Sequence, residues 1–360
     1  MTSIEGKGAR PTKTGAMAKM SDMAKSARPS WRQAIASLER PVLRASLWQI
    51  LNTAVPYFVL WGLMIWTLSI SYWLTLGIAV IAAAFLARMF MIFHDCTHGS
   101  FLGSRRANDW IGFVAGVLTF TPYRQWRHQH ALHHATSGDL DRRGTGDIWT
   151  LTVEEYLNAS RWKRFRYRVV RSPIVLFIVA PLYLFLIHHR IPSAAVGKRE
   201  RRGVHWTNGT LLAIIGLMSL TVGIKAYLLI QLPVLLLAGS AGIWLFYVQH
   251  QFDGVYWERR PEWDFAEAAL RGSSYYKLPK VLQWFSGNIG FHHIHHLSPA
   301  IPNYRLEKCH KENAAFQSVK AVTLWSGLCA LSFRLWDEER KKLVGFRRLR
   351  AARRRRSLPA

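Results

Sequence analysis

Two long stretches with almost no charge constrain the fold of this 360-residue chain more than any other feature. The first runs from Leu47 to Phe93 and contains one charged residue, Arg88. The second runs from Trp206 to Gln249 and contains only Lys225. A helix needs about 20 residues to cross the roughly 30 Å hydrocarbon core of a bilayer. Each stretch is therefore long enough for two crossings joined by a tight turn.

Histidines are gathered in three short clusters that follow apolar segments. Spacings of i, i+3 and i+4 place side chains on one helix face, and imidazole is a common metal ligand. A single HxxxH pair can also come from ordinary surface histidines. Each of the two HxxHH patterns, however, places three imidazoles on one helix face, where they would repel each other when protonated, and such crowding is costly without a shared ligand. We therefore expect one polynuclear metal site, with these candidate ligands: His94, His98, His130, His133, His134, His292, His295 and His296.

A shared site restricts the number of membrane crossings. Four spans, at about residues 47–68, 71–92, 207–224 and 226–248, place all three clusters on one face of the membrane. The shorter apolar runs at 110–123 and 172–187 are then expected to be interfacial or re-entrant, because a crossing by either run alone would separate the clusters. The predicted fold is an all-α integral membrane protein, with two helical hairpins and a cytoplasmic helical cap that holds the metals.

The distribution of charge supports the same topology. The formal net charge is +27, and basic runs such as Arg161–Arg168 and Lys198–Arg202 fall on the histidine side. By the positive-inside rule that side is cytoplasmic, which also places both termini there. Residues 1–40 are expected to be a disordered basic segment, 45–320 the membrane domain, and 321–360 an amphipathic, arginine-rich tail. Beside a membrane this tail favours anionic lipids over nucleic acid as its partner.

The remaining histidines divide into several classes. His250 ends the predicted fourth span and is a candidate ninth ligand, with support of a neighbouring ligand as the alternative. His293 points away from the face of its neighbours and is expected to support them, whereas His128 is expected to be structural. Interfacial or surface positions are expected for the others: His188, His189, His205 and His310.

The motifs resemble the histidine boxes of membrane fatty acid desaturases. The similarity extends to the sequence around the boxes, in the segments 126–134, 138–147, 246–252 and 287–297. These segments are similar to the acyl-lipid branch, and within it to bacterial and cyanobacterial desaturases of the Δ12 (ω-6) type. The resemblance covers roughly residues 45–320.

The resemblance implies two irons held by nearly all-histidine ligands, O2 as co-substrate, and removal of two hydrogens from an acyl chain. It assigns the eight box histidines as iron ligands and places His250 where the family has an additional one. Carboxylate or amide partners that fix the imidazole tautomers are proposed among Asp95, Asp139, Asp141, Asp147 and Asn288. Candidates for the wall of an acyl tunnel are Trp126, Trp149, Trp284 and Phe285, which an interfacial aromatic belt would also explain.

The chain carries no iron–sulfur or flavin motif, so the resemblance implies an external electron donor. Ferredoxin would suit the basic face, and cytochrome b5 is the alternative. The expected location is a bacterial inner membrane, and the expected reaction is conversion of oleoyl to linoleoyl chains. A lipid or alkane hydroxylase and a carotenoid-modifying enzyme would share the boxes. A metal transporter or receptor is the alternative from another class, although transporters place polar ligands within their spans.

Overall fold

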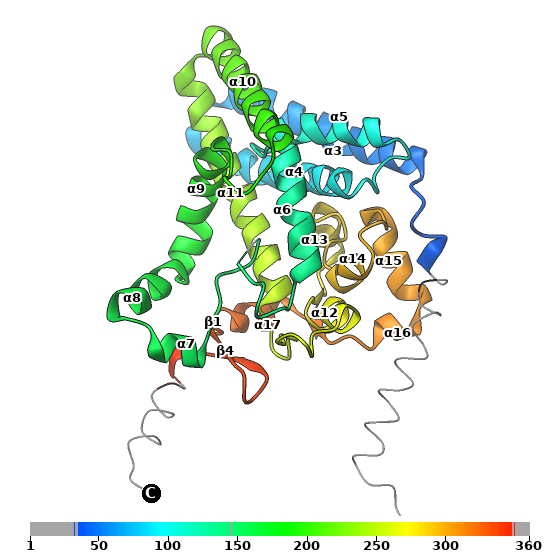
Figure 1. Ribbon diagram of the computed structural model, residues 1–360. Coiled ribbons are helices and arrows are strands. Elements are labelled where there is room, and N and C mark those ends of the chain that lie inside the picture. The colour runs from blue at the N-terminus through cyan, green and yellow to red at the C-terminus, as the bar shows by residue number, and fades with distance from the viewer. Residues whose placement is uncertain (1–31, 33–34, 145, 348, 350–360) are drawn as a thin grey trace, which may run out of the picture.

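The computed structural model describes residues 32, 35–144, 146–347 and 349, and these residues are mostly helical (Figure 1). Among them, three helices are long and apolar enough to cross a membrane: α3 (Leu43–Thr67), α4 (Tyr72–His98) and α11 (Ile224–His250). Helix α10 (Lys198–Thr221) covers most of the third predicted span but is not one of the three. Its first turn is rich in basic residues, which shortens its apolar part, so the number of four spans stays a prediction.

A bent helix pair covers the second short apolar run. Helix α8 (Arg161–Val170) is followed by η1 (Val175–Val179), α9 (Ala180–Leu186) and η2 (His188–Arg190), and the two parts meet at 60°. Such a pair is either a broken span or a re-entrant segment. The first short run is occupied largely by α5 (Arg105–Leu118), which at 14 residues is too short to cross a bilayer.

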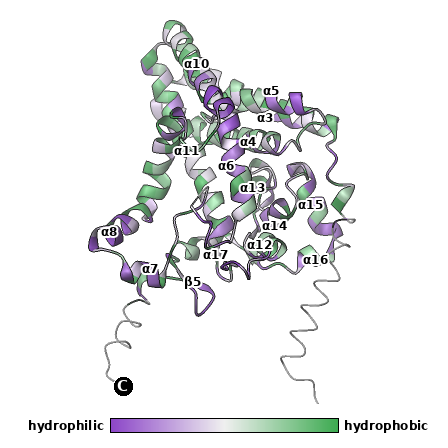
Figure 2. Ribbon diagram, in the orientation of Figure 1, coloured by the Kyte–Doolittle hydropathy of each residue, from purple (hydrophilic) through white to green (hydrophobic). Residues whose placement is uncertain are grey.

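Helix α4 lies at the centre of the apolar core. It packs against α3, α5 and α11, and the core includes Met64, Leu86, Phe93 and Ile230. Figure 2 shows hydrophobic colour along α3 and the outer part of the α10–α11 hairpin, and hydrophilic colour along α8. This distribution is what a bilayer around the long helices requires, because apolar side chains facing lipid need no protein partner.

Short helices surround the ends of α4 and α11. Figure 1 shows α12 to α16 gathered on one side of the molecule, while the turn between α10 and α11 projects from the opposite end. The helices of this part are α6 (Tyr123–Thr136), α7 (Val153–Asn158), α12 (Phe265–Arg271), α13 (Lys280–Phe285), α14 (His292–Leu297), α15 (Asn303–Glu312), α16 (Ala314–Gln317) and α17 (Leu324–Ala330).

Two small sheets tie the C-terminal part to the rest of the fold. In the first, β4 (Leu335–Asp337) pairs in parallel with β1 (Leu151–Thr152) and antiparallel with β5 (Lys342–Val344). In the second, β2 (Tyr275–Tyr276) pairs in parallel with β3 (Ala321–Val322). These strands of two or three residues are the exception to the expected all-α fold.

Both ends of the domain differ from the expected boundaries. A separate tail was expected from residue 321, but residues 321–347 are folded, and Trp336 is buried at 1% exposure. At the other end, Ile35 and Leu38 are buried against residues of α15, within the segment expected to be disordered. Residues 1–31, 33–34 and 350–360 lie outside the described residues, and so does the arginine run at 353–356.

Candidate metal centre

Four helices bring the predicted ligands together. Helix α4 carries two of them in its last turns and ends at Gly99, which adopts a left-handed conformation with φ of 74°. Glycine adopts this conformation at little cost, so α4 can end directly after His98. The last residue of α11 is His250, and the first residue of α14 is His292. Helix α14 also carries His295 and His296, and the other three candidate ligands lie on α6.

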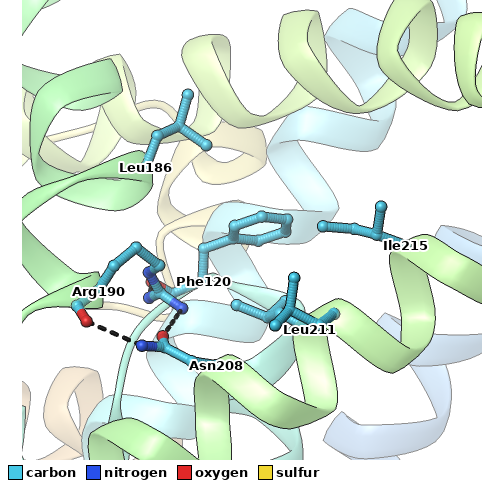
Figure 3. A pocket seen from close by; sticks show the side chains of 7 residues that line it. Phe120, Leu186, Arg190, Asn208, Leu211 and Ile215 are labelled. Atoms are coloured by element: carbon cyan, nitrogen blue, oxygen red, sulfur yellow. Dashed lines mark hydrogen bonds between the residues drawn. The ribbon is translucent and has the colours of Figure 1, made fainter.

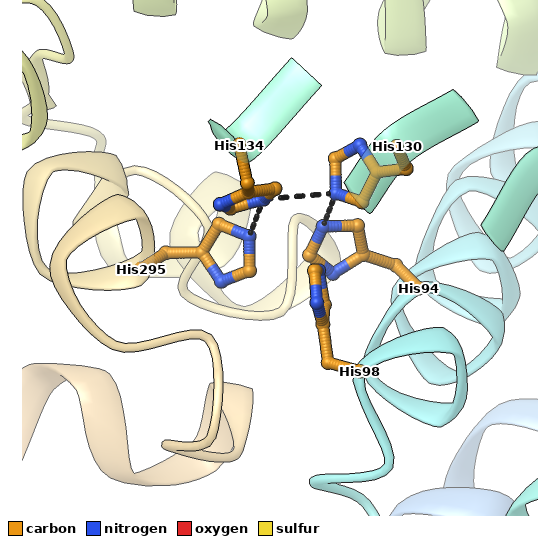
Figure 4. A group of neighbouring side chains, drawn as sticks. All are labelled: His94, His98, His130, His134 and His295. Carbon is orange, nitrogen blue, oxygen red and sulfur yellow. Dashed lines mark hydrogen bonds between the residues drawn. The ribbon is translucent and has the colours of Figure 1, made fainter. Parts of the chain in front are cut away.

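Five histidines form the first group, in which the ligand nitrogens all lie within 4.8 Å of one another: His94, His98, His130, His134 and His295. Figure 4 shows these imidazoles converging from α4, α6 and α14 on one point. The Nε2 atom of His130 is 2.9 Å from that of His94 and 3.1 Å from that of His134. The Nε2 atoms of His134 and His295 are 3.0 Å apart.

Four histidines form the second group by the same criterion: His133, His250, His292 and His296. All four side chains are buried. The Nε2 atom of His250 lies 3.2 Å from that of His133 and 3.0 Å from that of His292. His250, expected either to be a ligand or to support one, is therefore placed among the potential ligands.

The two groups are adjacent and share two helices. The rings of His134 and His296, one from each group, are stacked with centroids 4.2 Å apart. Adjacent residues of a helix differ by about 100° in direction, which lets His133 and His134 of α6 point into different groups. The same difference separates His295 and His296 of α14. The arrangement can hold two metal ions side by side.

Three of the imidazoles are oriented through their Nδ1 atoms. Asp95 lies 3.4 Å from Nδ1 of His94, and it also accepts hydrogen bonds from the backbone and side-chain nitrogens of Asn303. Asp147 lies 3.1 Å from Nδ1 of His133. Fixing Nδ1 in this way leaves Nε2 free to bind a metal.

The third oriented imidazole and the remaining predicted partners differ from the expectation. Nδ1 of His250 is 3.3 Å from the carbonyl oxygen of Gly272. This partner is a backbone group, whereas the expected partners were side chains. Among the other predicted partners, Asp139 bonds Arg142 and Arg260, Asp141 bonds Arg259, and Asn288 bonds Gln283 and Asn303. These three side chains bond other residues around the site instead of an imidazole, and the two carboxylates form charge-assisted hydrogen bonds with arginine.

The electrostatic environment favours the neutral form of five of the site histidines. Burial, followed by the proximity of the other imidazoles, holds the pKa of five of them well below the ordinary 6.5: His130, His134, His292, His295 and His296. Neutral imidazole is the form that binds metal. In addition, the Nε2 atoms of His98 and His296 are buried without a hydrogen-bond partner among the described residues. A bound cation would satisfy both atoms, so the donor set fits a pair of metal ions.

Aromatic side chains cover part of the centre. The ring of Trp126 stacks on His130 with centroids 4.2 Å apart. Phe246 lies one turn before His250 and contacts both His250 and His133, with centroids 5.1 and 5.3 Å away. Sequence reasoning did not single out Phe246, although its spacing of i−4 from His250 was a usable signal.

The other candidates for a tunnel wall lie in different places. Trp284 contacts Phe285 and Phe85, beneath the guanidinium of Arg88 at 3.8 Å from the ring centroid. Trp149 instead packs against Tyr167 and lines a separate hollow of about 260 Å³. The structure thus brings only Trp126 of this set against the site histidines, within the residues described.

The described contacts do not show the structural role expected of His128 or the supporting role expected of His293, whereas the histidines expected at the surface mostly lie there. His128, His188 and His205 are exposed, and His293 is buried beside Tyr275 and His310. His189 is the exception, because it is 3% exposed and packs against Phe185 rather than facing the surface. The apolar pattern of the sequence alone did not indicate this burial.

Comparison with known proteins agrees with the geometry. A Bacillus subtilis protein described as a fatty acid desaturase is 49% identical over 316 residues, which are 88% of this chain and 90% of the relative. Two Synechocystis proteins are also similar. The sn-1 oleoyl-lipid 12-desaturase is 27% identical, covering 67% of this chain and 68% of its own length. The sn-1 acyl-lipid omega-3 desaturase (ferredoxin) is 28% identical, covering 61% and 62%. The family model described as "Fatty acid desaturase" matches residues 71–327, and the chain therefore belongs to the fatty acid desaturase family.

Proposed function

We propose that this enzyme is an acyl-lipid desaturase that holds two iron ions, one in each histidine group. The observation that supports this proposal is the convergence of nine imidazoles, five in one group and four in the other, with ligand nitrogens within 4.8 Å inside each group. Neutral nitrogen ligands leave the ions strongly cationic, unlike the carboxylate-rich sites of soluble di-iron bundles. All nine histidines are assigned as ligands in this proposal.

The irons supply the O2 activation that abstraction of hydrogen from an unactivated methylene requires. The chain itself holds the ligands in one tautomer through Asp95, Asp147 and the carbonyl group of Gly272. Trp126 and Phe246 exclude water from two sides of the histidines. The acyl chain is expected to approach from the bilayer past Trp126, which is the aromatic residue in contact with both the site and the apolar core.

The position of the new double bond is the finer part of the proposal. We propose the Δ12 position, with oleoyl lipid as substrate, on the similarity of the histidine-box segments to Δ12 desaturases. Relatives whose names state a position divide between 12-desaturases and omega-3 desaturases at similar identity. The double bond therefore has to be located by experiment, and a hydroxylated product is the alternative that the same metal centre would support.

An external electron donor and a defined orientation complete the proposal. One Synechocystis relative carries ferredoxin in its name, and a small acidic protein of that kind suits the basic segments on the histidine side. The proposed location is the inner membrane, with the histidine face and both termini in the cytoplasm. Exposed basic residues on α8 and α10 would contact anionic headgroups at that surface.

Expression in a host that lacks polyunsaturated lipids tests this function. The lipids are extracted, and the double bond is located by mass spectrometry of derivatised fatty acids. New linoleate supports the full proposal, a new double bond elsewhere supports desaturation with another position, and a hydroxy fatty acid supports the alternative. His133→Ala should abolish the product, whereas the exposed control His205→Ala should not. Activity that survives His133→Ala would overturn the metal-site assignment.

A further inference from the structure

A cavity of about 310 Å³ lies outside the histidine centre, between α9, η2 and α10. Its lining is mostly apolar, and Figure 3 shows Leu186, Leu211, Ile215 and the ring of Phe120 around it. Leu212, which is 69% exposed, also lines it, so the cavity opens to the outside of the protein. Its volume is at the lower end of the range for small-molecule sites, which is about 300–1,000 Å³.

One end of this cavity carries a single cation. Nη1 of Arg190 donates to Oδ1 of Asn208 at 3.0 Å, and Nη2 donates to the carbonyl oxygen of Phe120. Asn208 in turn donates to the backbone carbonyl of Arg190 at 2.8 Å, so the guanidinium is held by neutral groups in a fixed position (Figure 3). Among the described residues, Arg190 forms no ion pair with a carboxylate, and its Nε is buried without a partner.

The backbone at Phe120 is strained in a way that serves this end of the cavity. Its φ of 55° is in the left-handed region, which a bulky residue rarely adopts. This conformation ends α5 and presents both the ring to the cavity and the carbonyl oxygen to Arg190. Strained residues of this kind persist where the surroundings fix them, and they are concentrated at ligand sites.

The polarity of the cavity matches that of an amphiphile in a membrane. Arg190 and Asn208 lie at one end, and Leu211 to Ile215 continue along α10 for about 10 Å from Asn208 at 1.5 Å per residue. Four exposed basic residues precede Asn208 on the same helix: Lys198, Arg199, Arg201 and Arg202. The charged end of a ligand would therefore lie toward the basic end of α10, and its apolar part toward the other end.

We propose that this cavity binds one anionic glycerophospholipid, with the phosphate on Arg190 and part of one acyl chain along Leu211 and Ile215. A phosphate would neutralise the guanidinium and could accept the second N–H of Nη1 and of Nη2, each of which donates one N–H to the protein. The apolar lining would pack against methylene groups of the acyl chain, and burying this apolar surface would favour binding. The site is distinct from the histidine centre and does not depend on the metal assignment.

Native mass spectrometry of the full chain in detergent tests the proposal. The protein is titrated with phosphatidylglycerol, with phosphatidylcholine of the same acyl chains, and with oleate. We expect one tightly held phosphatidylglycerol, and weaker binding of the other two. Arg190→Gln should weaken phosphatidylglycerol about tenfold, because one charge-assisted contact is lost. Arg190→Lys should weaken binding less than Arg190→Gln, since the charge remains but the guanidinium N–H groups are lost.

Two further variants separate the site from general attraction to anionic lipid. Arg202→Gln removes an exposed positive charge on the same helix outside the cavity, and it should leave the tight binding within twofold. Ile215→Trp fills the apolar end and should weaken binding although Arg190 is intact. Equal binding by wild type and Arg190→Gln, or equal weakening by Arg202→Gln, would overturn the proposal. Tighter binding of oleate than of phosphatidylglycerol would also overturn it, because the ligand would then be a carboxylate.

Discussion

Replacing Asp147 by asparagine should remove one metal ion in preference to the other. The Oδ1 atom of Asp147 lies 3.1 Å from Nδ1 of His133, and both side chains are nearly buried, at 9% and 1% exposure. Oδ2 accepts the backbone N–H of Gly144 at 3.1 Å, so asparagine fits the same space. The change therefore removes the negative charge that supports the imidazole without removing a ligand.

The size of the effect follows from the position of His133. Loss of a partner that orients a metal ligand typically costs about 10–100-fold in metal affinity, or about 1.4–2.7 kcal/mol. His133 belongs to the group of four histidines, and the group of five does not contain it. We therefore expect weaker binding in the four-histidine group, while the other group retains its ion.

The assay is a chelator titration of iron-loaded protein, followed by elemental analysis of the iron that remains. Wild type should lose its two ions over one range of chelator concentration, and Asp147→Asn should lose the first ion at about 10–100-fold lower concentration. Asp141→Asn is the matched control, because it lies in the same loop and its carboxylate bonds Arg259 rather than a histidine. Equal behaviour of the two variants, or loss of both ions together, would refute the reasoning.

Three further predictions concern stability. The pKa values of His130, His134, His292, His295 and His296 are lowered in the fold, so these five groups favour the folded metal-free protein above about pH 6.5. As the pH falls below this value, the free energy of unfolding should decrease by up to about 1.4 kcal/mol per pH unit for each group. A melting temperature that is constant from pH 7 to 5 would contradict this. Gly112→Ala would place a Cβ 2.2 Å from the ring of Tyr123, whose hydroxyl donates to the carbonyl oxygen of Cys96. This clash should lower the free energy of unfolding by about 1–3 kcal/mol, measured by thermal unfolding. Gly209→Ala is the control, because it has open space around it and should leave stability unchanged. Trp336→Ala should lower the free energy of unfolding by about 3–5 kcal/mol, since Trp336 is 1% exposed. Trp325→Ala is the control, because Trp325 is 74% exposed. Equal melting temperatures of the two variants would show that residues 321–347 do not stabilise the fold.

The sequence was sufficient to predict the long apolar helices and the histidines that the structure brings together. Helical spacing places HxxHH side chains near each other, and the apolar stretches explain why the three clusters meet at the same ends of the long helices. The division into five and four could not be predicted. It depends on how α6 and α14 are rotated against α4 and α11, and this rotation is set by packing across the whole fold.

The boundaries of the domain were harder to predict than its centre. Strands of two or three residues, such as β3 and β4, are too short to show an alternating pattern, so residues 321–347 read as a tail. The burial of Ile35 and Leu38 could not be predicted from the local sequence either, because it depends on tertiary contact with α15. The carbonyl partner of His250 had no signal in the sequence, since every residue carries such a group.

The sharing of α6 and α14 between the two histidine groups has a consequence for biosynthesis. Each group takes ligands from α14, which begins at residue 292, so neither coordination sphere is complete until four-fifths of the chain has been synthesised. In the proposed di-iron enzyme, metal loading would then be a late event, and an ion that binds only the completed arrangement would stabilise it by mass action. The iron supply of the cell would in this way determine how much of the newly made chain survives proteolysis.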